Sequence, residues 1–322
     1  MLIPILMFLL GFLLLIKGGD WFVDGAVGIA HRFHLPELLI GATIVSIGTT
    51  LPEVMVSSQA ALQGNAGISY GNAIGSIICN TSLIAALTVA IRPAKVNKKV
   101  IWFPVAAFFT AAALYAGFTY SAGRFFRWNG ILFLSLFAAY MVITVMKMKK
   151  DPDACDTSEN EASKERTLLQ ESLLLVAGAV AIAVGAHFLV NNGTLIAAWL
   201  GVPDSVIGLT MVALGTSLPE LITAITSLAK GHSSLSLGNI IGANLFNIVL
   251  VSGAAITISP FVVPTEKVAA GINASLLIDI PVMLCVMAIL CIPTLIKGEL
   301  KRWQGVLLLV IYTGFTVFQF VI

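Results

Sequence analysis

Two glutamates, Glu53 and Glu220, end two copies of one hexapeptide within sequence that is otherwise strongly apolar. Residues 48–53 read Gly-Thr-Thr-Leu-Pro-Glu, and residues 215–220, 167 positions later, read Gly-Thr-Ser-Leu-Pro-Glu. The likeness extends without a gap over segments 36–80 and 203–247, in which 17 of 45 positions are identical. A charge at the centre of a membrane helix costs about 2.5–3.5 kcal/mol on the lenient insertion scale. Two such charges at equivalent places predict one ion site built twice, as is typical of transporters.

Proline and glycine disturb the helix that carries each glutamate. Pro52 has no N–H, so the carbonyl of Gly48 loses its helical partner, and we expect a break or kink there. Gly215 and Pro219 repeat the pattern in the second copy. Irregular backbone at membrane depth is tolerated only where it lines a cavity or is buried in protein. The freed carbonyls are therefore expected beside the glutamates.

Side-chain oxygens accompany each glutamate at helical spacing. Thr49 lies four residues before Glu53 and shares its helix face. The hydroxyl residues that flank the two glutamates are Thr49, Thr50, Thr216 and Ser217. The next helix of the first copy carries a polar stripe, Asn72, Ser76 and Asn80, and the second copy carries Asn239, Ala243 and Asn247. The glycine pairs 71/75 and 238/242 predict close helix approach.

These groups are all hard oxygen donors, without thiolate or imidazole. Ca²⁺ takes six to eight such oxygens, whereas softer metals favour nitrogen or sulfur. Two carboxylates would neutralise one divalent ion, or Na⁺ ions in overlapping positions, and competition between the ions would give exchange. The ions are then substrates, and no cofactor is expected.

Composition predicts an all-α integral membrane protein. The chain is 58% hydrophobic and 11% charged, with a mean hydropathy of +0.98, whereas soluble domains carry about a quarter charged residues. Ten apolar stretches are long enough to span the hydrocarbon core as helices. They cover residues 2–28, 36–62, 70–91, 99–119, 126–146, 168–199, 203–229, 236–258, 268–293 and 303–321. The first stretch lacks the basic start and cleavage site of a signal peptide and is kept as a helix.

Basic residues predict the orientation of these helices. With the N-terminus outside, the inside loops hold 14 Lys and Arg residues and the outside loops hold three, a clear positive-inside bias. The net charge of +2 thus reports topology rather than nucleic-acid binding. Polar segment 147–167 is expected as a cytoplasmic connecting loop between halves 1–146 and 168–322. Five spans per half make the repeats inverted. We expect a cytoplasmic-membrane protein with both termini outside and no obligate protein partner.

The other polar residues give weaker evidence of a binding or catalytic site. The four cysteines show no metal-type spacing, and no histidine pair faces the repeats. Asp279 is expected to have a structural role, and Asp20 and Asp24 are expected at an interface or cap. An enzyme is disfavoured because no plausible nucleophile–base pair is present.

The two segments resemble the alpha-repeats of the cation/Ca²⁺ exchanger superfamily, in particular its sodium/calcium exchanger branch. The patterns that carry the resemblance are G-T-[ST]-L-P-E and G-N-x-x-G-[SA]-x-x-x-N. The resemblance implies an electrogenic antiporter that expels Ca²⁺ by admitting Na⁺, with alternating access around one central site. The rival hypothesis is an H⁺/Ca²⁺ antiporter, because two close carboxylates can share a proton.

The resemblance also implies a role for each residue. Glu53 and Glu220 would be shared by Ca²⁺ and Na⁺. Backbone carbonyls of Thr49 and Thr216 would bind Ca²⁺, and those of Ser46 and Ala213 would bind flanking Na⁺ ions. The residues expected to complete or shape the site are Ser76, Asn80, Asn247, Thr50 and Ser217. Two departures stand out: Ala243 replaces a serine that many relatives have, and Asn247 replaces an aspartate of potassium-dependent relatives. A weaker outer Na⁺ site and K⁺ independence are therefore expected.

Overall fold

The computed structural model describes residues 2–150, 166–200, 213–265, 268–269 and 272–321, and most of them are helical. The first half contains α1 (Leu2–Arg32), α2 (Glu37–Ile40), η1 (Gly41–Val45), α3 (Ser46–Leu62), α4 (Ala66–Cys79), η2 (Asn80–Ala85), α5 (Ala86–Ile91), α6 (Lys98–Ala122) and α7 (Arg127–Lys150). The second contains α8 (Leu168–Trp199), α10 (Ala213–Thr216), α11 (Leu218–Ala229), α12 (Ser233–Phe246), η6 (Asn247–Ser252), α13 (Gly253–Ile258), η7 (Ser275–Asp279), α14 (Ile280–Lys297) and α15 (Arg302–Val321). The η segments are π-helical turns.

Eight helical segments of the described chain are long and apolar enough to cross a membrane. They are Leu2–Arg32, Glu37–Leu62, Ala66–Ile91, Lys98–Ala122, Arg127–Lys147, Leu168–Gly193, Ser233–Ile258 and Ser275–Lys297. Of the predicted seventh span, residues 203–212 lie outside the described residues, and the remainder forms α10 and α11 with a turn at Ser217 between them. The predicted tenth span is α15. An all-helical membrane protein is thus confirmed, whereas the number of ten spans stays a prediction.

The predicted bounds of the ninth span were wrong. Residues Val268–Ala269 and Ile272–Asn273 pair as a short antiparallel hairpin, β1 with β2, and the helix begins only at Ser275. It continues through Pro293 and ends at Lys297, where Gly298 adopts a left-handed conformation with φ of 72°. Glycine is the residue that adopts this helix-ending conformation at least cost.

Local structure repeats at the same offset as the sequence. Elements α4, η2 and α5, which together cover 66–91, correspond residue by residue to α12, η6 and α13, which cover 233–258. Each π-helical turn begins at the repeated asparagine, Asn80 or Asn247. π-Turns inside α-helices occur frequently at functional sites. The two copies therefore have matching helices as well as matching residues.

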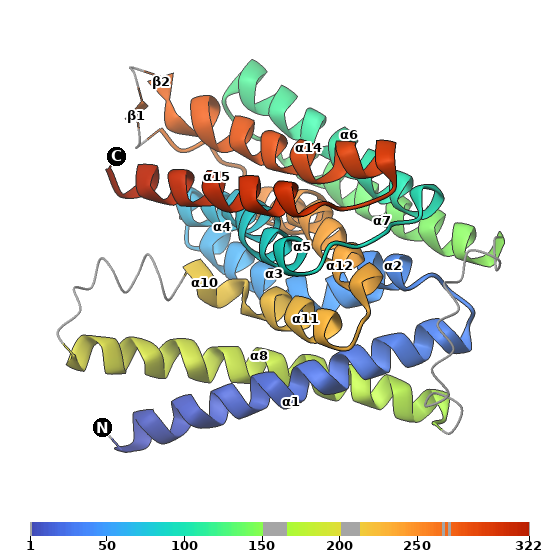
Figure 1. Ribbon diagram of the computed structural model, residues 1–322. Helices are drawn as coiled ribbons and strands as arrows, with labels where there is room; N and C mark the ends of the chain where they lie inside the picture. Colours follow the sequence, from blue (N-terminus) through green and yellow to red (C-terminus); the bar gives the residue numbers. More distant parts are fainter. Residues whose placement is uncertain (1, 151–165, 201–212, 266–267, 270–271, 322) are drawn as a thin grey trace.

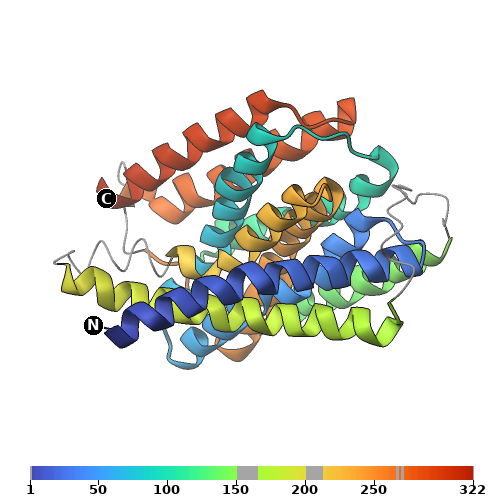
Figure 2. The ribbon, with the colours of Figure 1, turned by 60° about the horizontal axis from the view of Figure 1, so that its bottom comes forward.

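The two longest helices, α1 and α8, lie side by side along one side of the molecule, and the other helices gather beyond them (Figures 1 and 2). Glycines at seven-residue spacing line their contact. A methyl group added at Gly25 would lie 2.7 Å from the carbonyl oxygen of Glu171, and one at Gly18 would lie 3.0 Å from that of Gly178. Small residues allow the backbones to approach this closely, so α1 and α8 form a tightly packed pair.

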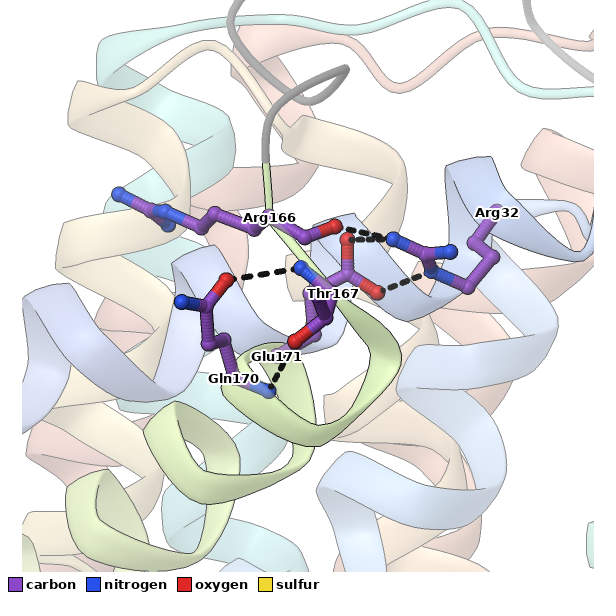
Figure 3. A network of polar contacts seen from close by, with 5 residues as sticks. All are labelled: Arg32, Arg166, Thr167, Gln170 and Glu171. Carbon is purple, nitrogen blue, oxygen red and sulfur yellow. Dashed lines mark hydrogen bonds and ion pairs between the residues drawn. The ribbon is translucent and has the colours of Figure 1, made fainter.

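A polar network joins one end of this pair (Figure 3). Arg32 Nε donates to Glu171 Oε2 at 2.8 Å, and the same guanidinium donates to the carbonyl of Arg166. Thr167 and Gln170 form a reciprocal capping box at the start of α8, with bonds of 2.8 and 3.3 Å. The start of α1 and the end of α15 both lie at the opposite end of the molecule, on different sides of it (Figures 1 and 2).

Candidate cation site

Helices α3 and α11 bring the two repeated glutamates together. Glu53 on α3 and Glu220 on α11 are both fully buried, and the two helices contact each other. Within the described residues, none of their four carboxylate oxygens has a hydrogen-bond partner, and neither forms an ion pair with Lys, Arg or His. An uncompensated buried charge is strongly unfavourable. The pair therefore requires a positive charge from outside this part of the chain.

Other buried oxygens with no hydrogen-bond partner in the described residues lie on these helices or on π-helical turns that contact them. They include Thr50 Oγ1, Ser217 Oγ, Asn80 Oδ1 and Asn247 Oδ1. Asn247 has a defined orientation because its Nδ2 donates to the carbonyl of Ala243 at 3.0 Å, which leaves Oδ1 as the free atom. Most buried polar groups in proteins are satisfied. A group of unsatisfied oxygens around two carboxylates is the donor set that a hard cation needs.

Asn239 connects the two copies. Thr49 Oγ1 donates to Asn239 Oδ1 at 3.1 Å, and Ser46 Oγ donates to the Asn239 carbonyl at 2.9 Å. Thr49 also lies beside the carboxylate of Glu220. These contacts hold α3 of the first copy against α12 of the second. The predicted site residues Ser46 and Thr49 are therefore placed at the junction of the copies.

Asn72 supports the first glutamate in a similar way. Its Nδ2 donates to the carbonyl of Glu53 at 3.1 Å and to Ser57 Oγ at 2.8 Å. Asn72 and Asn239 were not among the predicted ligands, although the Gly-Asn dipeptide repeated in both copies was a signal for them. Their side-chain amides bond to the backbone carbonyl of Glu53 and to the side-chain hydroxyl of Thr49, a role that residue type alone does not reveal.

The remaining predicted residues occupy the same helices. Ser76 on α4 and Ala243 on α12 are buried, Thr216 ends α10 and is half-buried, and Ala213 begins α10. Their ligand roles stay predictions. The close approach predicted for the second glycine pair is found: a methyl group at Gly242 would lie 2.6 Å from Ala42 Cα. For the first pair, Gly71 and Gly75, no heavy atom of the described residues lies within 4 Å of an added methyl group.

The predicted helix break is present in only one copy. In the second copy α10 ends at Thr216, Ser217 forms a turn, and α11 starts with Pro219 in its first turn. In the first copy α3 remains helical through Pro52, so the break is absent there and the alternative, a kink, stays a prediction. Proline removes one helical hydrogen bond, and a helix packed on several neighbours can accommodate that loss as a bend.

A small pocket lies between the α1–α8 pair and this junction. Its lining includes Thr49, Pro52 and Pro219 from the two repeats and Phe22 and Ala179 from the pair. The pocket thus reaches the backbone beside both glutamates from one side.

Polar residues outside the repeats have structural partners. Gln319 donates to Asp279 Oδ1 at 3.1 Å, in keeping with the structural role expected for that residue. Lys230 Nζ lies 2.7 Å from Asp24 Oδ1 and 3.4 Å from Asp20 Oδ1. These contacts join α1 to the end of α11 and do not involve the glutamate pair.

A helical membrane protein with two buried, unneutralised carboxylates among hydroxyl and amide oxygens has the features of a cation transporter. The family model described as "Sodium/calcium exchanger protein" matches residues 3–146 and 171–321. The chain belongs to the sodium/calcium exchanger family and is a membrane cation/Ca²⁺ exchanger. The family resemblance deduced from the repeated motifs is thereby confirmed.

Similar proteins match over nearly their whole length. The sodium/calcium exchanger MaX1 of Methanosarcina acetivorans is 33% identical in an alignment that covers 98% of both chains. The inner membrane protein YrbG of Escherichia coli is 33% identical over 297 residues, 90% of this chain and 89% of YrbG. A solved structure of the sodium-calcium exchanger NCX_Mj, soaked with Na⁺, has a TM-score of 0.79 and 31% identity, with 97% of each chain covered.

Proposed function

We propose that this protein exchanges Na⁺ for Ca²⁺ across the cytoplasmic membrane at the Glu53–Glu220 pair. The observation that carries the proposal is the set of four buried carboxylate oxygens without a protein partner in the described residues. Two negative charges match one Ca²⁺, and Na⁺ ions at overlapping positions match them equally. The relatives named as sodium/calcium exchangers support the choice of ions.

The same charges favour exchange over one-way transport. An empty site would carry two uncompensated charges in a low-dielectric interior, which costs several kcal/mol even after relaxation. The empty site is therefore expected to change its accessibility much more slowly than the loaded one. When ions leave the site on one side of the membrane, other ions must bind before the site becomes accessible from the other side. This requirement couples Na⁺ flux to Ca²⁺ flux by alternating access.

We propose that some of the further oxygens bind Ca²⁺ and that others bind Na⁺. Carbonyls of Thr49 and Thr216 would complete Ca²⁺ coordination, and those of Ser46 and Ala213 would serve flanking Na⁺ ions. Ser76, Asn80 and Asn247 would add side-chain oxygens, and Thr50 and Ser217 would shape the centre. The pocket that reaches Thr49, Pro52 and Pro219 supports an ion path on the side of α1 and α8.

The proposed topology is ten spans in two inverted halves, 1–146 and 168–322, with 147–167 as a cytoplasmic connecting loop. Matching local structure at a constant offset supports the duplication. The 14 to three distribution of basic residues supports an outside location for both termini. The end that carries the Arg32–Glu171 pair would then face the cytoplasm.

Removal of each site charge tests the proposal. Glu53→Gln and Glu220→Gln should abolish Na⁺-dependent ⁴⁵Ca²⁺ uptake into proteoliposomes, because the neutral amide cannot balance a divalent ion. Both variants should remain folded, since the substitution is isosteric and removes an uncompensated charge. Asp279→Asn is the matched control, because an amide oxygen can still accept the Gln319 hydrogen bond. Wild-type uptake in either glutamine variant would contradict the central claim.

Proton coupling is the alternative, because two adjacent carboxylates can bind a proton in place of a metal ion. Sodium-free vesicles with an imposed pH gradient separate the two hypotheses. Ca²⁺ movement driven by the pH gradient alone would favour H⁺/Ca²⁺ exchange, whereas movement that requires Na⁺ would favour the proposed coupling.

A further inference from the structure

A second, shallow pocket lies at the end of the molecule that carries the α11–α12 turn, away from the glutamate pair. Its floor is apolar and includes Leu237 and Ile240. Its polar lining consists of Thr88, Arg92, Ser233 and Ser236. These side chains come from α5, the loop after it, and the first turn of α12.

The first turn of α12 presents free backbone donors at this pocket. His232 occupies the N-cap position and makes no side-chain capping bond. The first N–H groups of a helix have no partner within the helix, and the helix dipole places partial positive charge there. The end of a 14-residue helix is therefore suited to an anion.

Ser236 provides an independent indication of a ligand. Its side chain lines the pocket, the residue is only 3% exposed, and its Oγ has no hydrogen-bond partner in the described residues. A buried hydroxyl without a hydrogen-bond partner is destabilising. The hydroxyl can donate to an acceptor that enters the pocket.

Arg92 supplies a full positive charge. Its Nη1 donates to the carbonyl of Leu228 at 3.3 Å, which holds the guanidinium at the pocket while its other N–H groups remain as donors. Among the described residues Arg92 forms no ion pair. Glu299 in the neighbouring loop lies 2.9 Å from Lys301, and this contact holds the pKa of Glu299 below its usual range. Glu299 is thus already neutralised by another partner.

We propose that this pocket binds a phosphate group, held by Arg92, the Ser236 hydroxyl and the free N–H groups of α12. Arg92 and Ser236 line this pocket together with the first turn of α12, and guanidinium and helix N-termini are established phosphate partners. A lipid headgroup and inorganic phosphate present the same donor requirements, and the apolar floor would contact the apolar part of a lipid. Glu37 is the carboxylate nearest the start of α12, and it is paired with His232 at 2.8 Å. The inference does not depend on which ion drives Ca²⁺ exchange.

Binding to the purified full-length protein tests this assignment. The probes are inorganic phosphate, dioctanoyl phosphatidylglycerol, and dioctanoylglycerol, which has the same acyl chains without phosphate. Saturable binding of either phosphate compound, but not of dioctanoylglycerol, is expected. Binding of phosphatidylglycerol alone would identify a lipid site, and binding of inorganic phosphate alone would identify a site for the free anion.

Two variants locate the binding. Arg92→Gln should weaken it about 10-fold or more, because a charged hydrogen bond contributes about 1.5–3 kcal/mol. Ser236→Ala should weaken it several-fold and remain folded, since its hydroxyl has no protein partner to lose. Lys99→Gln removes an exposed charge from the same end and should bind as the wild type does. Wild-type affinity in both Arg92→Gln and Ser236→Ala, or no saturable binding to the wild type, would overturn the proposal.

Discussion

Replacement of Gly242 by alanine tests the close approach between α12 and the η1–α3 segment. A methyl group at Gly242 would lie 2.6 Å from Ala42 Cα and would also overlap Ser46 Oγ. Carbon atoms in contact prefer about 3.5–4.0 Å, so the segments must separate by about 1 Å. Because Ala42 Cα belongs to the backbone, no side-chain rotation relieves the overlap.

The separation would also break contacts at the candidate cation site. The bonds from Ser46 Oγ and Thr49 Oγ1 to Asn239 are 2.9 and 3.1 Å long and would exceed hydrogen-bonding distance. Overpacking costs about 2 kcal/mol, and two buried hydrogen bonds contribute about 2 kcal/mol. Alanine regains about 1 kcal/mol in helix propensity. The expected loss of stability is therefore about 3 kcal/mol, or about 6 °C in melting temperature at about 2 °C per kcal/mol.

Thermal unfolding of the purified protein measures the first effect, and ⁴⁵Ca²⁺ uptake in proteoliposomes measures the second. Gly314→Ala on α15 is the matched control, because no heavy atom of the described residues lies within 4 Å of the added methyl group. The control should be as stable as the wild type or slightly more stable. If Gly242→Ala matched this control in melting temperature and transported Ca²⁺ at the wild-type rate, the inferred contact between α12 and η1 would be wrong.

Two further predictions concern ion selectivity. Ala243→Ser restores the hydroxyl that Ser76 has in the first copy and should lower the Na⁺ concentration for half-maximal uptake by about 2- to 5-fold; an unchanged Na⁺ titration would show that this hydroxyl does not matter. Uptake should also proceed fully without K⁺, because Asn247 leaves the site with one negative charge fewer than an aspartate would. If K⁺-free vesicles took up no Ca²⁺ and uptake returned when K⁺ was added, that expectation would be contradicted.

Sequence reasoning was strongest where a residue pattern has one low-energy solution. A long apolar run has to be a helix in lipid, because every backbone polar group must be satisfied internally, and Leu168–Trp199 was predicted with its observed bounds. Segment 268–273 was less predictable, since a short apolar run is compatible with a hairpin or with the start of a helix. Its composition alone does not decide between them.

The charged residues of the candidate site could be predicted from the sequence, whereas the residues that position them through hydrogen bonds could not. Two glutamates in apolar sequence identify a centre because charge burial is costly wherever the chain folds. Asn72 and Asn239 act through hydrogen bonds to Glu53 and Thr49, and such bonds depend on helix rotation and on contacts between elements far apart in the chain. Residue spacing within one helix cannot predict them.

The helix break shows how nearly identical residues reach different structures. Residues 48–53 and 215–220 differ only at Thr50 and Ser217, yet α3 is continuous whereas the second copy turns at Ser217. Local propensity is almost the same in both, so the surroundings must select the form. α3 packs on α4, η6, α12 and α13, while α10 and α11 face α8, α12 and α1. Nearly the same hexapeptide can therefore adopt both backbone forms. In the inverted-repeat exchanger proposed above, each copy would adopt one form when the site is open to one side, and the copies would exchange forms when it opens to the other.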